Sequence, residues 1–235
     1  MRLGYFTHVV GGSRPAEAYR ETVRLAVAAE RLGYDSFWVA QHHGRPSAGW
    51  LPSPLLLLAA VAEHTSTIAL GTAVVAAPLE HPHRLAEDAA VLDALSGGRL
   101  RLGLGAGSDP RASAEFGTDH SARHGDALAV LDRLCALLDG PTLVPPAPGL
   151  RGRLWWATGS PAGADAAAER GLGLLCARPP GPAVLADLAR YRARATGRAR
   201  VTVSRVAGPD RAGELRREWS VDPVLAGADE LLVQA

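Results

Sequence analysis

The sequence predicts an α/β fold, a compact (β/α)8 TIM-like barrel, from three observations. Apolar segments of strand length alternate strictly with longer segments of helical periodicity, which indicates a parallel sheet covered by helices. Eight strands are expected, the number that closes such a barrel. The 235 residues are close to the roughly 250 that are typical of this barrel, although length alone also allows two smaller domains. With eight strands we expect a single domain over residues 1–235. An open, doubly wound sheet is the alternative, because it shows the same alternation.

The expected elements follow in chain order. Strands are expected at residues 2–6, 34–40, 67–75, 99–105, 154–158, 172–177, 200–206 and 230–234. Helices are expected at residues 15–32, 54–64, 83–96, 121–139, 161–170 and 181–195, and over part of 211–227. Gly140–Arg153 is rich in proline and glycine and is predicted to be a connector.

The third strand and the helix after it give the clearest local signals. Thr67–Ala76 is a nearly unbroken apolar and β-branched run, which is typical of a parallel strand buried on both faces. Pro82 suits the first turn of a helix, where its missing N–H costs nothing. Apolar residues then recur at helical spacing, and Gly97 and Gly98 end the helix.

Spaced glycines mark the fourth strand. In Arg99–Gly107, the glycines Gly103, Gly105 and Gly107 fall on one face of a strand with a period of two. A strand face without side chains lets a large flat molecule approach the backbone. The spacing is not the dinucleotide-binding motif, because no helix opens directly after it. Residues 108–120 are expected to form a long loop that folds over a ligand.

The last strand, 230–234, has no helix after it, since the sequence ends there. Leu231 and Val233 point to one side and Leu232 to the other, so both faces are apolar. We expect the outer face to be bare, and soluble monomers avoid such an apolar strip. Part of 211–227 could double back over this strand, but a homodimer is the simpler cover.

Composition excludes several classes of function. The balance of 25 basic and 24 acidic residues gives no electrostatic footprint for nucleic acid. No apolar run is long enough for a membrane span and no signal peptide is visible, so a cytoplasmic protein is expected. Two cysteines, and histidines without the spacing of zinc proteases, predict no disulfide scaffold and no metal site.

In such a barrel the working residues lie at the carboxyl ends of the strands and in the following loops. This rule selects Thr7-His8, Gln41–His43, Ala73–Pro78, Gly105–Ser108, Thr158–Ser160 and Cys176–Arg178. His42 and His43 are the candidates for proton transfer, because imidazole titrates near neutrality. Adjacent residues of an extended chain point to opposite faces, so we expect one of the two to reach the cavity. The alternative for either histidine is a hydrogen bond that caps the strand.

The turn after the fifth strand is the candidate phosphate site. Thr158, Gly159 and Ser160 precede Pro161 and an alanine-rich helix, and barrels often hold a phosphate at such a helix N-terminus. Gly159 permits close approach of the backbone, and Ser160 supplies a hydroxyl. An ordinary N-cap would explain Ser160 equally well.

Several of these segments together resemble one family. The sequence is similar to bacterial luciferase and the wider luciferase-like flavin monooxygenases at Trp38–His43 (WVAQHH), Ser53-Pro54 and Ser66–Asp119, which ends in Phe116–Asp119 (FGTD). The resemblance is nearly collinear over residues 1–125 and is much weaker beyond them. It implies a catalytic role for His42, in a motif whose family Glu is replaced here by Gln41.

The resemblance also implies how the flavin would be held. A cis peptide between Ala73 and Val74 is expected beside the flavin ring, and the flavin phosphate is expected at Ser160. Ala106 stands where luciferase has an arginine that binds this phosphate. Another basic residue, either Arg111 or Arg123, would have to replace that contact.

The activity implied by the resemblance is a flavin-dependent monooxygenase that uses reduced FMN and dioxygen to oxygenate a small organic substrate. No nicotinamide-binding unit is visible, so reduced flavin is expected from a separate flavin reductase. Relatives commonly dimerise through helices on the barrel exterior, which agrees with the expected homodimer. The alternatives are a deazaflavin (F420)-dependent oxidoreductase, which shares the fold, and a non-catalytic flavin-binding protein. The short chain, Gln41 and Ala106 favour the last of these.

Overall fold

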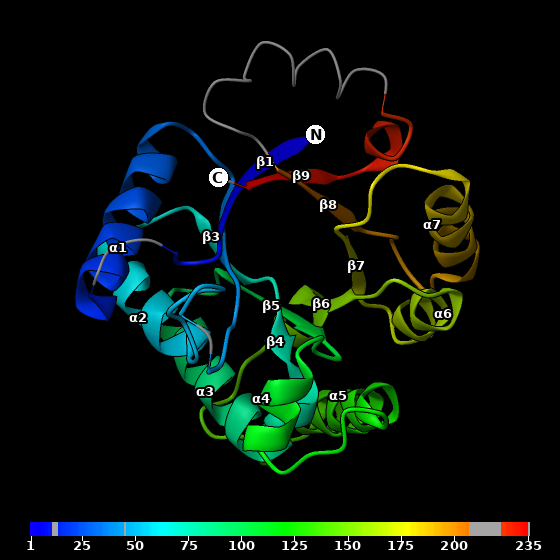
Figure 1. Ribbon diagram of the computed structural model, residues 1–235, viewed down its shortest axis with the longest axis horizontal. Helices are drawn as coiled ribbons and strands as arrows, with labels where there is room; N and C mark the ends of the chain where they lie inside the picture. The colour runs from blue at the N-terminus through cyan, green and yellow to red at the C-terminus, as the bar shows by residue number, and fades with distance from the viewer. Residues whose placement is uncertain (11–13, 45, 207–221, 235) are drawn as a thin grey trace.

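The computed structural model describes residues 1–10, 14–44, 46–206 and 222–234 and shows a closed parallel barrel with helices around it (Figure 1). The strands run in the order β3-β2-β1-β9-β8-β7-β6-β5-β4, and a pairing of β3 with β5 closes the ring. Because β3 and β4 are two pieces of the expected third strand, the barrel has eight strands. The predicted fold class is confirmed, and the open doubly wound sheet is wrong.

The bounds of the elements agree closely with the expected ones. The strands are β1 (Arg2–Thr7), β2 (Ser36–Val39), β3 (Ala69–Thr72), β4 (Val75–Ala76), β5 (Leu100–Gly105), β6 (Leu154–Ala157), β7 (Gly173–Cys176), β8 (Val201–Val206) and β9 (Glu230–Gln234). The α-helices are α1 (Pro15–Arg31), α2 (Pro54–His64), α3 (Pro82–Leu95), α4 (Pro110–Glu115), α5 (Arg123–Asp139), α6 (Pro161–Glu169) and α7 (Pro182–Arg194). Short 3₁₀ turns are η1 (Ala77–Leu79), η2 (Leu150–Arg153) and η3 (Leu225–Gly227).

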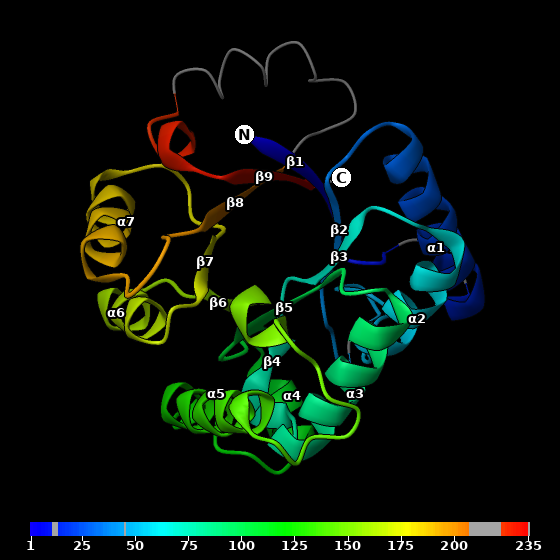
Figure 2. The same cartoon turned by 180° about the vertical axis from the view of Figure 1, so that it is seen from behind.

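Two expectations about the helical layer need correction. The segment 108–120 is not a plain loop, because Asp109 caps α4 by accepting a hydrogen bond from the Arg111 N–H, and Pro110 begins that helix. The helix expected within 211–227 lies mostly outside the described residues, and the described end of that segment forms η3. From behind, the helices again stand outside the ring of strands (Figure 2). None of the helices in the described ranges is long and apolar enough to span a membrane.

The third strand is interrupted between β3 and β4. The peptide bond between Ala73 and Val74 is cis, as the resemblance implies. β3 pairs with β5 at Leu70, and β4 pairs with β5 at Val75. Both pieces therefore share β5 as a neighbour, and the residues between them lie at the carboxyl end of the barrel.

Large residues pack against glycines of the neighbouring strand inside the barrel. Trp38 is in register with Gly71, and Trp155 is in register with Gly173. A methyl group added at Gly71 would lie 2.1 Å from Trp38 Cδ2, and one at Gly173 would lie 2.2 Å from Trp155 Cε3. The two indoles meet edge to face with their centroids 6.1 Å apart. We call the buried set inside the barrel the inner cluster: Phe6, Trp38, Ala40, Trp155, Leu175 and Leu232.

A charged network closes the amino end of the barrel. The buried carboxylate of Glu230 accepts hydrogen bonds from Arg101 Nη1 at 2.7 and 2.9 Å, and from Ser36 Oγ at 2.6 Å. Thr202 Oγ1 donates to the same carboxylate at 3.2 Å, and Trp38 Nε1 donates to Ser36 Oγ at 2.7 Å. In barrels of this type the amino end carries stability and the carboxyl end carries the chemistry. This network is therefore structural.

The outer face of the last strand is covered, contrary to the expectation from the sequence. Leu231 is 0% exposed. It belongs to the outer cluster, the apolar layer between strands and helices, together with Val224 and Leu225 of the turn before β9. Leu232 belongs to the inner cluster. The expectation of a fully bare strip is therefore wrong, because Leu231 is buried, whereas Val233 on the same face is partly exposed.

Candidate active site at the barrel mouth

Small side chains form the floor of the barrel mouth. Ala73, Val74 and Ala157 are partly exposed and pack onto the inner cluster at the carboxyl ends of the strands. A methyl group at Gly105 would lie 3.0 Å from Val74 Cγ2 and 3.6 Å from Ala157 Cβ. These four residues, which we call the floor, leave an apolar surface that a planar ring can approach. A larger side chain at Gly105 would occupy that space.

The glycine face expected for the fourth strand is split. A methyl group at Gly103 would lie 2.1 Å from the carbonyl oxygen of Thr72, so this glycine is packed inside the barrel wall. β5 ends at Gly105, so the period of two does not extend to Gly107, whose φ of +71° suits glycine. Ala106 packs against the outer cluster. Gly105 is the glycine of this segment that borders the floor.

The carboxyl ends of β1 and β2 bring two histidines together. His8 Nδ1 and His42 Nε2 are 2.8 Å apart, and the ring centroids are 5.1 Å apart. The backbone N–H of His42 donates to the Leu51 carbonyl at 2.8 Å, which fixes the chain beside the ring. Burial lowers the pKa of His42, and the neighbouring His8 and His43 lower it further, whereas Asp109 opposes the shift. Both rings are therefore held toward their neutral forms near neutrality.

The ring of His43 has a different neighbour, but His42 and His43 both line one cavity, which differs from the expectation that only one of them reaches it. Its ring meets Phe116 edge to face, with a centroid distance of 4.7 Å and an interplanar angle of 69°. Burial lowers the pKa of His43, and the charge of Glu115 opposes the shift. Its buried Nε2 has no hydrogen-bond partner within the described ranges. A bound molecule could supply that partner, because a cavity of about 400 Å³ lies beside His42 and His43.

Gln41 joins three segments at the end of β2. Its Oε1 accepts from the Ala76 N–H at 2.7 Å, directly after the strand break. Its Nε2 donates to Glu80 Oε1 at 2.9 Å and to the Pro52 carbonyl at 3.1 Å. Burial raises the pKa of Glu80, and the hydrogen bond from Gln41 opposes that shift. The Gln41 amide therefore accepts one hydrogen bond and donates two. An ionised carboxylate at this position could accept but could not donate.

The turn after β6 is an N-cap with a further hydroxyl beside it. Ser160 Oγ accepts from the Gly163 N–H at 3.2 Å and caps α6. Thr158 Oγ1 accepts from the Ser160 N–H at 3.1 Å. The cap uses Ser160 as an acceptor and leaves its O–H able to donate to an anion. Capping and anion binding are therefore compatible in this turn.

Arg178, in the loop after β7, contacts this turn. Its Cδ lies 3.7 Å from the position of a methyl group on Gly159. It forms an ion pair with Asp187 of α7, and its buried Nε has no hydrogen-bond partner among the residues that the structure describes. Arg111 is exposed on α4, and Arg123 donates to the His120 carbonyl at 2.9 Å. Of the three arginines, Arg178 is the one placed beside the candidate phosphate turn.

Reasoning from the sequence misses Glu80, which carries no local signal that links it to residue 41. The strand-end rule does select His8 and Arg178, but it does not indicate that His8 meets His42 or that Arg178 lies beside the phosphate turn. Cys176, selected by the same rule, is buried in the outer cluster and not at the mouth.

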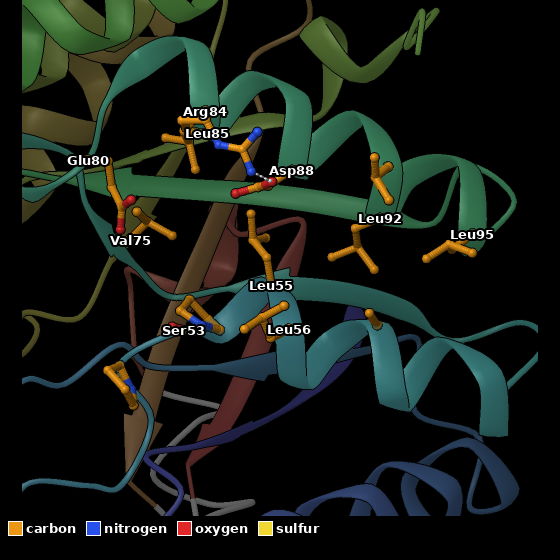
Figure 3. A pocket seen from close by; sticks show the side chains of 14 residues that line it. Ser53, Leu55, Leu56, Val75, Glu80, Arg84, Leu85, Asp88, Leu92 and Leu95 are labelled. Atoms are coloured by element: carbon orange, nitrogen blue, oxygen red, sulfur yellow. Dashed lines mark hydrogen bonds and ion pairs between the residues drawn. The ribbon is translucent and has the colours of Figure 1, made fainter. Parts of the chain in front are cut away.

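An apolar groove of about 400 Å³ lies outside the barrel, between α2 and α3 (Figure 3). Leucines of the two helices line it: Leu55, Leu56, Leu92 and Leu95. Leu56 is 76% exposed and Leu95 is 53% exposed. These are large apolar surfaces for helices that face water.

Comparison with known sequences identifies relatives. The sequence model of the luciferase-like monooxygenases matches residues 1–218. An uncharacterized protein, y4wF, of Sinorhizobium fredii is 33% identical over 195 residues, which are 76% of this chain and 57% of that protein. The 4-hydroxyprotoasukamycin monooxygenase of Streptomyces nodosus is 41% identical over 128 residues, 52% of this chain and 34% of that protein. The oxygenase component of the flavin-dependent trigonelline monooxygenase of Acinetobacter baylyi is 35% identical over 111 residues, 46% of this chain and 31% of that protein. The chain thus spans only part of each of these relatives.

Solved structures share the barrel. Monooxygenase RslO1 of Streptomyces bottropensis matches with a TM-score of 0.80 at 25% identity, over 93% of this chain and 75% of that one. The oxygenating constituent of 3,6-diketocamphane monooxygenase of Pseudomonas putida, solved in complex with FMN, matches with a TM-score of 0.75 at 22% identity, over 95% and 72%. An F420-dependent secondary alcohol dehydrogenase matches with a TM-score of 0.72 at 16% identity, over 99% and 92%.

Three independent observations now agree. The barrel is closed and parallel, its third strand is interrupted by the cis bond at Ala73–Val74, and the family match covers nearly the whole chain. The chain belongs to the luciferase-like monooxygenase family.

Proposed function

We propose that this chain binds reduced FMN at the barrel mouth and oxygenates a small organic substrate with dioxygen. The observation that carries the proposal is the floor of small residues, Ala73, Val74, Gly105 and Ala157, at strand ends that share the mouth with His42. When bound, the flavin supplies the reaction with dioxygen. The chain's own residues bind and orient the ring, exclude water and hold protons.

Individual residues take distinct roles in this proposal. The floor holds the ring, and Gly107, after β5, lets the backbone turn beside it. Thr158, Gly159 and Ser160 bind the phosphate. Arg178 takes the role of the arginine that luciferase has at the position of Ala106. His42 exchanges a proton with the bound molecules, and His43 lines the cavity beside it.

Titration of tryptophan fluorescence with reduced flavins under anaerobic conditions tests the proposal. We expect micromolar or tighter binding of reduced FMN and weaker binding of FAD, because the turn at Thr158–Ser160 offers one phosphate site. Consumption of dioxygen by the complex, beyond that of free reduced FMN, would distinguish a monooxygenase from a non-catalytic flavin-binding protein. Failure to bind any flavin would refute the proposal.

A deazaflavin-dependent oxidoreductase is the second candidate. It is favoured by the fit of the F420-dependent alcohol dehydrogenase structure over 99% of this chain. That fit concerns the fold alone, which flavin-dependent and deazaflavin-dependent proteins share. Tighter binding of F420 than of reduced FMN in the same titration would replace the first candidate with this one.

A separate flavin reductase is the proposed source of reduced FMN. The name of the trigonelline relative, an oxygenase component, supports this arrangement. We expect turnover to require an added reductase with its nicotinamide and FMN. Turnover of the purified chain with nicotinamide and FMN alone would exclude the requirement.

The groove between α2 and α3 supports a homodimer, although the outer face of β9 does not. A second copy packed on Leu56 and Leu95 would bury side chains that are otherwise 76% and 53% exposed. Light scattering should give twice the chain mass. Leu56→Glu should give the chain mass, whereas a matched Leu32→Glu, on an exposed residue just after α1, should leave the dimer intact. A monomeric parent chain would refute the proposal.

A further inference from the structure

We propose that His8 is a positioning residue for His42, and that the two imidazoles share one proton which fixes the tautomer of His42. The inference deepens the proposed function, since it rests on His42 as the group that exchanges protons at the mouth. It concerns a side chain 34 residues away in sequence, directly after a different strand, β1.

The contact between the rings requires a shared proton. His8 Nδ1 and His42 Nε2 are 2.8 Å apart, the distance of a hydrogen bond between two ring nitrogens. One nitrogen must donate and the other must accept, because two lone pairs or two N–H groups facing each other would repel. The pair therefore cannot carry two protonated rings and keep this contact.

Packing holds both rings in this arrangement. A methyl group at Gly49 would lie 2.2 Å from the His8 carbonyl oxygen and 2.6 Å from His42 Cδ2, so the loop before α2 lies directly on the pair. The His8 ring also lies against Phe6, with centroids 4.9 Å apart. The backbone N–H of His42 is held by the Leu51 carbonyl. The rings are therefore fixed from several sides.

The contact of His8 with Gln234 bears on which of the two rings donates the shared proton. His8 also has a hydrogen bond with the Gln234 side chain. In the proposed arrangement His8 Nδ1 is engaged by His42, and His8 donates from Nε2 to the Gln234 amide oxygen. His8 Nδ1 then carries a lone pair and accepts from His42 Nε2–H. This leaves Nδ1 of His42 as an acceptor, the state of a general base.

Other charged groups act on the pair from the surrounding elements. His43, the next residue, and His8 both disfavour a protonated His42. Asp109, at the N-cap of α4, favours it. Gln234 of β9 is neutral and acts through its hydrogen bond. In the neutral pair, His8 acts on His42 mainly as the acceptor of its Nε2–H, so removing His8 removes that acceptor.

Imidazole ¹⁵N NMR of the flavin-free protein tests the proposal without activity. In the parent chain we expect His42 as the Nε2–H tautomer. His8→Asn keeps an acceptor near the position of Nδ1, so the tautomer should persist. His8→Ala removes the acceptor, so the tautomer should be lost. His64→Asn, on an exposed histidine of α2 that contacts the Ala60 carbonyl, is the matched control and should not change the tautomer.

Kinetics with reduced FMN give the second readout. His8→Ala should slow turnover by at least about tenfold, less than the roughly 10²-fold of removing a general base itself. In His8→Asn most activity should return. An unchanged tautomer of His42 in His8→Ala would overturn the inference. A shared-proton signature in a protein that binds no flavin would sustain the pairing and overturn the proposed function instead.

Discussion

Replacing Gln41 by glutamate restores the residue type of the related luciferase motif but should destabilise this chain, because residue 41 faces a carboxylate here. Gln41 Nε2 donates to Glu80 Oε1 at 2.9 Å and to the Pro52 carbonyl at 3.1 Å. An ionised glutamate at this position would lose both donors and bring two negative charges together. Its carboxylate could still accept from the Ala76 N–H, as Gln41 Oε1 now does.

The magnitude follows from this geometry. Two unit charges about 4 Å apart repel by about 4 kcal/mol at an effective dielectric constant near 20. Both side chains are partly exposed, so we discount this to about 2 kcal/mol. The lost hydrogen bond to Pro52 adds about 1 kcal/mol. We expect Gln41→Glu to lower the unfolding free energy by about 3 kcal/mol at pH 8.

The sign of the pH dependence follows from the raised pKa of the folded pair. In the unfolded chain a glutamate titrates near pH ~4.3. A carboxyl whose folded pKa lies above that value contributes stability that is present at lower pH and is lost as pH rises through the folded pKa. The cost of Gln41→Glu should therefore shrink as pH falls from 8 toward 5.

A swapped double variant provides the decisive comparison. In Gln41→Glu with Glu80→Gln, the amide and the carboxylate exchange places and their hydrogen bond returns, whereas the bond to Pro52 does not. Urea denaturation should show a loss of about 1 kcal/mol for the swap, against about 3 for Gln41→Glu alone. If the swap is as unstable as Gln41→Glu alone, the pairing with Glu80 does not govern this position.

Three further changes have expected outcomes. Burial raises the pKa of Glu30, but hydrogen bonds from three backbone N–H groups outweigh burial and lower this pKa to about 2. Glu30→Gln should therefore lower the unfolding free energy by about 1 kcal/mol at pH 7, after discounting for exposure. In urea melts this difference should vanish as pH falls from about 4.5 to about 2. Gly71→Ala should cost at least about 1–3 kcal/mol in the same melts because the methyl group would meet the Trp38 ring, whereas Gly152→Ala, with open space around it, should cost little. His42→Ala should slow turnover by roughly 10²-fold with little change in unfolding free energy, and unaltered kinetics would return His42 to a capping role.

The path of the chain could be read from local patterns. The apolar run at 67–75 predicts a buried strand, and Pro82 with Gly97 and Gly98 predicts the helix α3 almost to the residue. Such signals depend on neighbours within a few residues, so a sequence contains them in full. Knowledge of the family added the cis bond at Ala73–Val74, which no local pattern predicts.

The contacts of the site depended on register between strands distant in sequence. The sequence places His8 and His42 at strand ends, but only the pairing of β1 with β2 sets their rings 2.8 Å apart. Nothing near Gln41 indicates Glu80, since a turn 39 residues later delivers its carboxylate.

The last strand shows the same division between local pattern and tertiary contact. Alternation in sequence gives both faces of β9 an apolar character, with Leu231 on one side and Leu232 on the other. Whether the outer face is bare depends on which segments pack against it, and in the described structure Leu231 is buried in the same apolar layer as Val224 and Leu225. Periodicity is a property of one segment, whereas the burial of a side chain depends on contact between at least two segments. The sequence alone therefore determined the barrel and the strand ends that form its mouth, and tertiary packing decided which side chains meet there.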